Sequence, residues 1–224
     1  KWGGLVAVNQ VGIVLKRGEI HAVIGTNGAG KSTLINLLSG EISVSSGDIE
    51  ILGKVVTNWS QPIRAKIGIG RSYQRNTIFP ELTVFENCRL AAQAHKQNPW
   101  QIWQAADHCS YSVNKAVEVI EKTGLKESLD RFAGELSHGQ KRQLEVAMCL
   151  ATDPRILLLD EPLAGMGADE TERMLNFLNE LKPNHAILLV EHDMDAVFKV
   201  AARITVLVNG SVLACGTPAE GKDD

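Results

Sequence analysis

The sequence predicts an α/β fold with an antiparallel β lobe near its start and an inserted α-helical lobe. Two apolar runs, residues 156–159 and 186–190, have the composition of buried parallel strands. Residues 81–151 carry helical patterns and no convincing strand. A chain of 224 residues can build one sizeable core, so we expect a single domain over residues 1–224, with the helical lobe at about residues 80–151.

The composition excludes several classes of protein. A net charge of −3, with no run of Lys and Arg, leaves no electrostatic footprint for nucleic acid, so we expect no nucleic-acid partner. The four cysteines lie far apart without metal-ligand spacing, which favours isolated thiols in a reducing cytosol. No apolar run has the length of a membrane span and no secretory leader opens the chain. We therefore expect a soluble protein whose natural ends lie beyond residues 1 and 224.

The first residues predict short antiparallel strands. Residues 5–15 alternate irregularly between apolar and polar side chains and end at a turn over residues 16–18. Trp2 lies on this segment just ahead of a glycine-rich loop, where its ring could stack on a purine. The alternative for Trp2 is a role in packing.

The glycine-rich loop, residues 25–32, matches the pattern G-x-x-x-x-G-K-[ST] between an apolar run and a helical pattern. Its glycines let successive backbone N–H groups face phosphate oxygens, and the following helix directs its positive dipole end at them. We expect Lys31 to reach the β- and γ-phosphates and the Ser32 hydroxyl to ligate Mg²⁺. A glycine-rich turn that happens to carry a lysine is the alternative.

Two strands are predicted after the first helix. Residues 46–53 predict a strand between glycines, and residues 67–74 predict another that runs into a loop and ends at Gln74. The Gln74 amide becomes a candidate for function only if this strand finishes beside the phosphates. A solvated cap is the alternative.

The predicted helical lobe contains two capping boxes. Thr83 and Glu86 begin one helix, which we expect to stop near Pro99, and a further helix is predicted from Ser112 to Gly124.

The second box lies in residues 136–140, where Ser137 and Gln140 precede a long apolar helix. The Ser137 hydroxyl, together with the missing side chain of Gly139, leaves this helix N-terminus open to an anion. An ordinary helix cap is the alternative.

Two acidic residues finish the apolar run of residues 156–159. Adjacent strand residues point to opposite sides, so Asp160 and Glu161 can have different roles. We expect Asp160 to hold Mg²⁺ through water and Glu161 to polarise a water beyond the γ-phosphate. The alternative is a pair of N-cap residues for the helix predicted over residues 169–181.

The last third predicts one more candidate residue and a closing hairpin. His192 is expected to begin a helix at the carboxyl edge of the sheet, where ligands bind in open α/β folds, although a structural histidine is the alternative. Asn209-Gly210 between two apolar runs predicts a type I′ hairpin.

The order of these motifs resembles the nucleotide-binding subunits of ABC transporters over essentially the whole chain. The matching motifs are a Walker A loop at residues 25–32, a Q-loop at Gln74, a signature at residues 136–140, a Walker B strand at residues 156–161 and a switch histidine at His192. Trp2 falls at the adenine-stacking position of that family. The resemblance implies a P-loop NTPase (RecA-like) core that binds ATP and Mg²⁺ and hydrolyses ATP.

The resemblance also implies roles for individual residues. It implies catalytic roles for Lys31, Gln74, Glu161 and His192, and a magnesium site at Ser32, Gln74 and Asp160. The implied nucleotide contacts are Trp2, Asn27, Gly28, Ala29, Gly30, Lys31, Ser32, Thr33, Ser137, Gly139 and Gln140.

Within the family, the chain is most similar to the importer ATPases for branched-chain and other hydrophobic amino acids. The similarity rests on residues 71–75, 79–84 and 136–140. Urea-importer ATPases and lipid or lipopolysaccharide exporter ATPases share parts of these segments and remain alternatives. The chain departs from the family pattern at His138, where glycine is commoner, and at Gly167, the end of the D-loop (residues 164–167), where aspartate is usual.

The resemblance further implies that ATP is bound between two chains. From the far end of an inserted lobe, the signature helix cannot reach its own phosphate loop, so it is expected to serve a second copy or a paralogous ATPase in a head-to-tail dimer. Transmembrane permease subunits, and indirectly a solute-binding protein, are the other implied partners, which places the chain peripherally at the cytoplasmic face of the inner membrane. A soluble ABC ATPase without a transport role, a P-loop phosphotransferase and a non-hydrolysing regulator are the rival classes.

Overall fold

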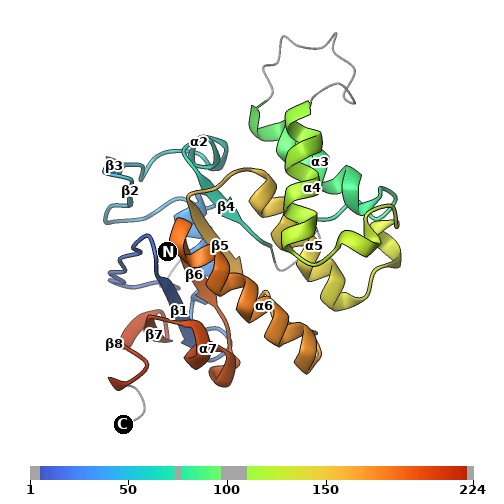
Figure 1. Cartoon of the computed structure of the whole chain (residues 1–224). Coiled ribbons are helices and arrows are strands. Elements are labelled where there is room, and N and C mark those ends of the chain that lie inside the picture. The colour runs from blue at the N-terminus through green and yellow to red at the C-terminus, as the bar shows by residue number, and fades with distance from the viewer. Residues whose placement is uncertain (1–5, 74–76, 97–109, 221–224) are drawn as a thin grey trace. The chain divides into compact units, whose positions relative to one another are not determined.

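The computed structural model describes residues 6–73, 77–96 and 110–220 (Figure 1). The chain divides into two units. The first comprises Lys1–Arg71, Arg155–Glu161 and Asn179–Asp224, and the second comprises Ser72–Pro154 and Pro162–Leu178. The helical lobe expected at residues 80–151 falls within the range of the second unit.

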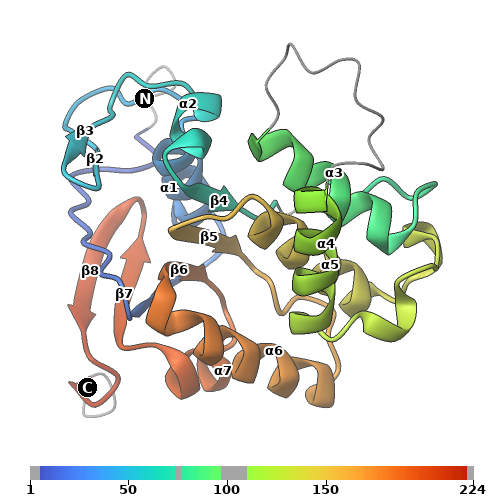
Figure 2. The same ribbon diagram turned by 45° about the horizontal axis from the view of Figure 1, so that its top comes forward.

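One sheet organises the first unit (Figure 2). Its order among the described residues is β4-β5-β6-β1-β7-β8, with parallel pairing everywhere except between β7 and β8. The parallel α/β class predicted from the sequence is therefore confirmed. The strands are β1 Ile20–Gly25, β4 Ile69–Arg71, β5 Ile156–Asp160, β6 Ala186–Val190, β7 Arg203–Val208 and β8 Ser211–Gly216.

Strand β1 is buried on both faces, which explains its continuous apolar sequence. Val23 belongs to a core cluster with Leu34 of helix α1 (Lys31–Ser39). Ala22 packs in a second cluster with Val197 of helix α7 (Met194–Val200). Because successive side chains of a strand point to opposite faces, the helix that follows the glycine-rich loop is fixed to one face of the sheet.

The predicted N-terminal strands are wrong for residues 6–19, where the structure has no strand. Val8, Val11 and Ile13 instead pack singly against the core of the first unit. Gln10 has a φ of 49°, a left-handed conformation that interrupts the extended alternation, so the antiparallel ladder does not form. Residues 1–5, and with them Trp2, lie outside the described part of the chain.

The other β predictions are met in part. The strand predicted over residues 46–53 is only β2 Glu50–Ile51, which pairs antiparallel with β3 Lys54–Val55 across a two-residue turn. The hairpin at Asn209-Gly210 is confirmed, with φ values of 48° and 78° as a type I′ turn requires.

A buried arginine closes the C-terminal end of α1. Arg64, on helix α2 (Gln61–Lys66), is 1% exposed. Its guanidinium donates to the carbonyl oxygens of Leu37 at 2.7 Å and Leu38 at 2.8 Å, and also to those of Trp59 and Thr57. The bonds to Leu37 and Leu38 satisfy carbonyls in the last turn of α1, and they anchor the end of α1 remote from the loop.

The described part of the second unit is helical. Thr83 caps the first of its helices by accepting the N–H of Glu86 at 3.1 Å, while the Glu86 carboxylate bonds Arg89. The predicted stop of that helix near Pro99 lies outside the described residues. Its α-helices are α3 Val84–Lys96, α4 Ser110–Lys122, α5 His138–Ala151 and most of α6 Ala168–Leu181, and short 3₁₀ turns occur at Lys126–Ser128 and Ala133–Glu135. A further 3₁₀ turn, Lys182–Asn184, belongs to the first unit.

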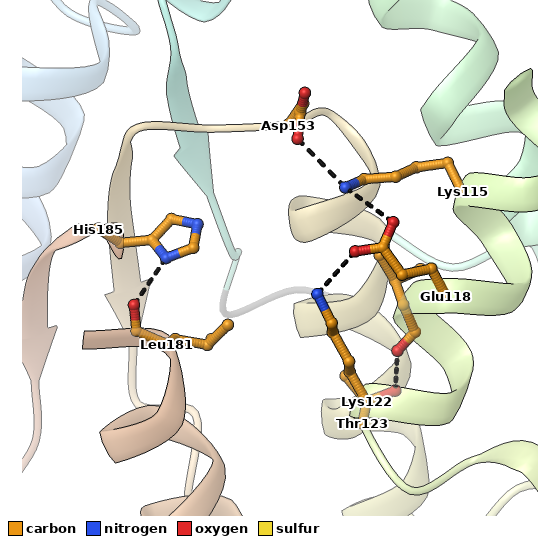
Figure 3. A network of polar contacts seen from close by, with 8 residues as sticks. Lys115, Glu118, Lys122, Thr123, Asp153, Leu181 and His185 are labelled. Atoms are coloured by element: carbon orange, nitrogen blue, oxygen red, sulfur yellow. Dashed lines mark hydrogen bonds and ion pairs between the residues drawn. The ribbon is translucent and has the colours of Figure 1, made fainter. Parts of the chain in front are cut away.

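An ion pair joins α4 to the turn that follows α5, and two further ion pairs lie within α4 (Figure 3). The Lys115 ammonium lies 3.1 Å from Asp153 and 3.3 Å from Glu118, and Lys122 lies 2.6 Å from the same Glu118.

Among the described residues, no helix combines the length and the apolar character that crossing a membrane requires.

Candidate active site

The glycine-rich loop joins β1 to α1 with a backbone that only glycine adopts easily. Gly28 and Gly30 have φ values of 81° and 103°. A Cβ atom added to Gly30 would lie 2.3 Å from the carbonyl oxygen of Ala7, so a side chain there is excluded. Gly30 is also the N-cap of α1 and has no side chain that could bond the first N–H groups of the helix. Those N–H groups suit an anion such as phosphate.

The Lys31 ammonium lies inside this loop. Its Nζ donates to the carbonyl oxygens of Gly25 at 2.7 Å and Thr26 at 3.1 Å, and the residue is only 7% exposed. A buried cation next to the open N-terminus of α1 gives the loop the charge that a polyphosphate requires.

A buried carboxylate faces the start of α1. Asp160, the last residue of β5, is 2% exposed and shares a hydrogen bond with the Ser32 side chain. Burial raises the pKa of Asp160, and the charge of Glu161 raises it further, whereas Arg71, Ser32 and Lys31 oppose the rise. A cation beside Asp160 would stabilise the ionised carboxylate and so lower its pKa.

Mg²⁺ fits the donors at this place. The ion prefers hard oxygen ligands, and the Asp160 carboxylate and the Ser32 hydroxyl supply two from the protein. Across the described residues there is no cluster of three or more His, Cys, Asp or Glu side chains that could hold a metal ion. The small number of protein ligands suits Mg²⁺, which keeps several waters and binds substrate phosphates.

Glu161 has a strained backbone. Its φ is 50°, an uncommon value for a residue other than glycine, and its N–H donates to the Val190 carbonyl of β6 at 2.9 Å. Its Oε1 lies 3.6 Å from Nδ1 of His192, whose side chain is 60% exposed. The ends of β5 and β6 thus bring together two side chains that the sequence singled out separately.

His192 does not begin a helix, contrary to the prediction. Helix α7 starts at Met194, and Asp193 is its N-cap, with Oδ1 accepting the N–H of Ala196 at 3.1 Å. The short Asp193 side chain makes this capping bond, which leaves His192 in the preceding loop.

Arg71, at the end of β4, was not recognised as a site residue from the sequence. Its guanidinium donates to Ser39 at 2.8 Å and also bonds Asn36 and Glu41. It therefore links β4 to the C-terminal end of α1, and its charge lowers the pKa of Asp160. A charged residue that ends a buried strand was the available signal.

The residues predicted from the second capping box form a separate group in the second unit. Ser137 accepts the N–H of Gln140 at 3.2 Å, and Gln140 Oε1 accepts the N–H of Ser137 at 3.1 Å, so the predicted box is confirmed. Gly139, in the first turn of α5, is buried while Ser137 and His138 are exposed.

One contact of α5 is with Tyr73, which precedes Gln74 in the sequence. Arg142 donates to the Tyr73 carbonyl at 3.1 Å and to Glu145, whose side chain is 2% exposed, at 2.6 Å. Burial raises the pKa of Glu145, and Arg142 opposes that rise. Gln74 itself lies outside the described residues, so its predicted position beside the phosphates stays a prediction.

Comparison with known proteins agrees with this geometry. A family model described as ABC transporter matches residues 8–164. The chain is 38% identical over 229 residues to LivG of Salmonella typhimurium, a high-affinity branched-chain amino acid transport ATP-binding protein, covering 98% of this chain and 89% of that one. It is 34% identical over 233 residues to BraF of Pseudomonas aeruginosa, which carries the same description, with 100% and 91% covered.

A solved structure is similar over almost the whole chain. It is the ADP conformation of MJ1267, an ATP-binding cassette of an ABC transporter, and superposes with a TM-score of 0.88 at 31% identity. The match covers 99% of this chain and 89% of MJ1267.

The raised pKa of Asp160 predicts how stability changes with pH. Because its folded-state pKa lies above the unfolded value, the ionised carboxylate opposes folding at pH values above the folded pKa, and this opposition disappears as the pH falls through it. In Mg²⁺-free buffer at neutral pH, we expect Asp160→Asn to melt at a higher temperature than wild type. The difference should narrow towards pH 4. Equal melting shifts at both pH values would mean that burial of the charge is not the cause, and Asp169→Asn, at an exposed position, is the control.

The positive φ of Glu161 predicts that glycine at this position is more stable than alanine, the reverse of the usual order in a helix. Glu161→Gly and Glu161→Ala both remove the carboxylate, but only glycine adopts a positive φ without strain. We expect the glycine variant to be more stable by about 1 kcal/mol in urea unfolding. At the exposed helical position Glu172, alanine should be more stable than glycine by about 1 kcal/mol. If alanine were more stable than glycine at both positions, the backbone of Glu161 would not be strained.

Proposed function

The chain belongs to the ABC transporter family, and on that premise we propose that it is the ATP-hydrolysing subunit of a transporter, with each ATP site completed by a second chain. The observation that carries the proposal is the convergence, in the first unit, of a cationic phosphate loop, a buried carboxylate and a carboxylate–histidine pair. Each is a part that phosphoryl transfer requires.

The phosphate loop binds the polyphosphate of ATP. Backbone N–H groups of residues 27–33 surround the β- and γ-phosphates, and the Lys31 ammonium exchanges its two carbonyl partners for phosphate oxygens. Ser32 and Asp160, with Gln74 as a third, would hold Mg²⁺, which would neutralise charge on the β- and γ-phosphates. Trp2 stacks on the adenine. For Trp2 and Gln74 the support comes from the sequence alone.

Glu161 acts as the general base. Its carboxylate accepts a proton from the water that attacks the γ-phosphate, an effect worth roughly 10²–10⁴-fold in rate. Its strained backbone, held by the bond to Val190, fixes the direction of the side chain. His192 lies within reach of both Glu161 and the solvent-exposed edge, and it orients the attacking water.

Ser137, Gly139 and Gln140 act on the nucleotide of the partner chain. The positive end of α5 binds the γ-phosphate held by the partner, so ATP closes a head-to-tail dimer and hydrolysis removes the shared charge that holds it closed. Differential contacts with ATP and ADP supply the conformational work.

Membrane permease subunits receive that motion at the cytoplasmic face of the inner membrane, where the chain is peripheral. Phe79 and Phe132 support a docking role for the second unit, since they are 52% and 51% exposed. Their segments are neighbours, because the N–H of Gly134 donates to the Pro80 carbonyl at 2.9 Å. A solute-binding protein takes part indirectly, through the permease.

Branched-chain amino acids are the proposed cargo. LivG and BraF are described as branched-chain amino acid transport ATP-binding proteins, and this chain matches about nine-tenths of each. The urea importers and the lipid or lipopolysaccharide exporters, which share segments with this sequence, are the second candidates.

Sharing of the two sites can be tested by mixing variants. Lys31→Ala loses its own phosphate loop, and Ser137→Arg obstructs the signature offered to a partner. Each variant alone should hydrolyse ATP at least about 10²-fold more slowly than wild type. In a mixed homodimer, one composite site keeps both intact halves, so part of the activity should return. If the two variants are shown to form a heterodimer but no ATPase activity returns, the ATP site is not one that two chains share and that works independently of the other site.

The cargo can be tested by reconstitution. The chain is combined with its permease and solute-binding partners in vesicles that contain ATP, and uptake of radiolabelled leucine and urea is compared. We expect ATP-dependent leucine uptake that Glu161→Gln lowers by about 10²-fold or more, and no urea uptake. Urea uptake, or export of lipid from the same vesicles, would replace the proposed cargo.

A further inference from the structure

The D-loop of this chain lacks a carboxylate where its family usually has one. Position 167 is glycine instead of aspartate, immediately before helix α6. The function proposed above gives the signature, residues 136–140, a place at the partner's nucleotide, so an acidic side chain that links this loop to the signature would act on dimer closure. The nearest acidic side chains in the sequence are Asp169 and Glu170, in the first turn of α6.

Glu170 reaches back to the glycine. Its Oε2 accepts the backbone N–H of Gly167 at 3.2 Å, and the Gly167 carbonyl accepts the N–H of Thr171 at 2.9 Å. Gly167 is therefore the N-cap of α6, and Glu170 makes the return bond of a capping box. The bond places a carboxylate on the backbone of the residue that lacks one.

The same carboxylate also packs on the signature. A Cβ atom added to Gly139 would lie 2.3 Å from Oε2 of Glu170 and 2.8 Å from Oε1. Gly139 is in the first turn of α5, where the helix dipole favours a negative group. The same segments also lie close at a second place, since a Cβ atom added to Gly165 would lie 3.7 Å from the Cβ of His138.

We propose that Glu170 is a positioning residue that supplies the carboxylate missing at position 167 and fastens the D-loop to the signature glycine. One side chain touches both segments, so the turn before α6 and the first turn of α5 are presented to the partner chain as one body. The absence of a side chain at Gly139 is needed for this contact within the chain, in addition to any contact with a nucleotide. The proposal rests on the function proposed above.

A simple helix cap is the competing explanation, and it makes different predictions. A cap contributes to the stability of α6 but has no effect on ATP-driven dimer closure. Asp169 provides a matched control, since it is exposed, carries the same charge and lies in the same turn. Gly167→Asp provides a repair, because aspartate at an N-cap position both caps the helix and returns the carboxylate.

The functional test measures hydrolysis, nucleotide affinity and dimer formation separately. In Glu170→Ala we expect kcat to fall about tenfold or more, from misplacement of the closing surfaces. Binding of a fluorescent ATP analogue to the monomer should be unchanged. In a Glu161→Gln background, about tenfold more ATP should be needed to form the dimer.

The control and the repair separate this role from that of a helix cap. Asp169→Ala should behave as wild type, and Gly167→Asp combined with Glu170→Ala should recover most of kcat. Equal results for Glu170→Ala and Asp169→Ala, or a lowered Tm with unchanged kcat, would overturn the proposal.

The contact itself is tested without ATP. Gly139→Ala puts a methyl group where the flexible Glu170 carboxylate lies, so it should displace that carboxylate and lower the Tm about as much as Glu170→Ala does, with little further loss when the two changes are combined. Additive shifts would overturn the contact. If the wild-type chain neither hydrolyses ATP nor dimerises while the Tm shifts are coupled, the proposed function fails and the link between the two segments stands.

Discussion

A carboxylate removed from water, that of Asp160, is the constraint on which the first unit depends. Its burial favours the neutral form, and the charges and dipoles that oppose this come from two elements: Arg71 from the end of β4, and Ser32 and Lys31 from the start of α1. The sheet therefore has to bring β4 and β5 side by side at the start of α1. Burial of the charged carboxylate costs free energy when the protein folds, and the same burial makes the carboxylate a strong ligand for a cation.

Signals that are local in the sequence predicted the structure well. Continuous apolar runs gave the parallel strands, Asn209-Gly210 gave its hairpin, and Ser137 with Gln140 gave its capping box, because each depends on neighbours only a few residues apart. The first residues were mispredicted because their apolar side chains pack singly on the core and do not pair as strands.

Features created by tertiary structure escaped prediction. Nothing in the order of residues shows that Glu161 adopts a left-handed backbone, that Arg71 bridges to α1, or that Glu170 lies on Gly139. Each depends on segments that meet only after the chain has folded. The acidic pair at the end of β5 and His192 were recognised singly, but the 3.6 Å contact between Glu161 and His192 follows from the pairing of β5 with β6.

The guanidinium of Arg64 has an evolutionary consequence. It bonds carbonyls at the end of α1, and the adjoining residue Gly40, with a φ of 83°, leaves no room for a side chain, since an added Cβ would lie 3.0 Å from the Arg64 Nε. Loss of the arginine would leave buried carbonyls without a hydrogen-bond donor. A side chain at position 40 would displace the arginine. Substitution at either position is thus conditional on the other, so the two should covary among descendants of this chain, although both lie at the end of α1 remote from the glycine-rich loop.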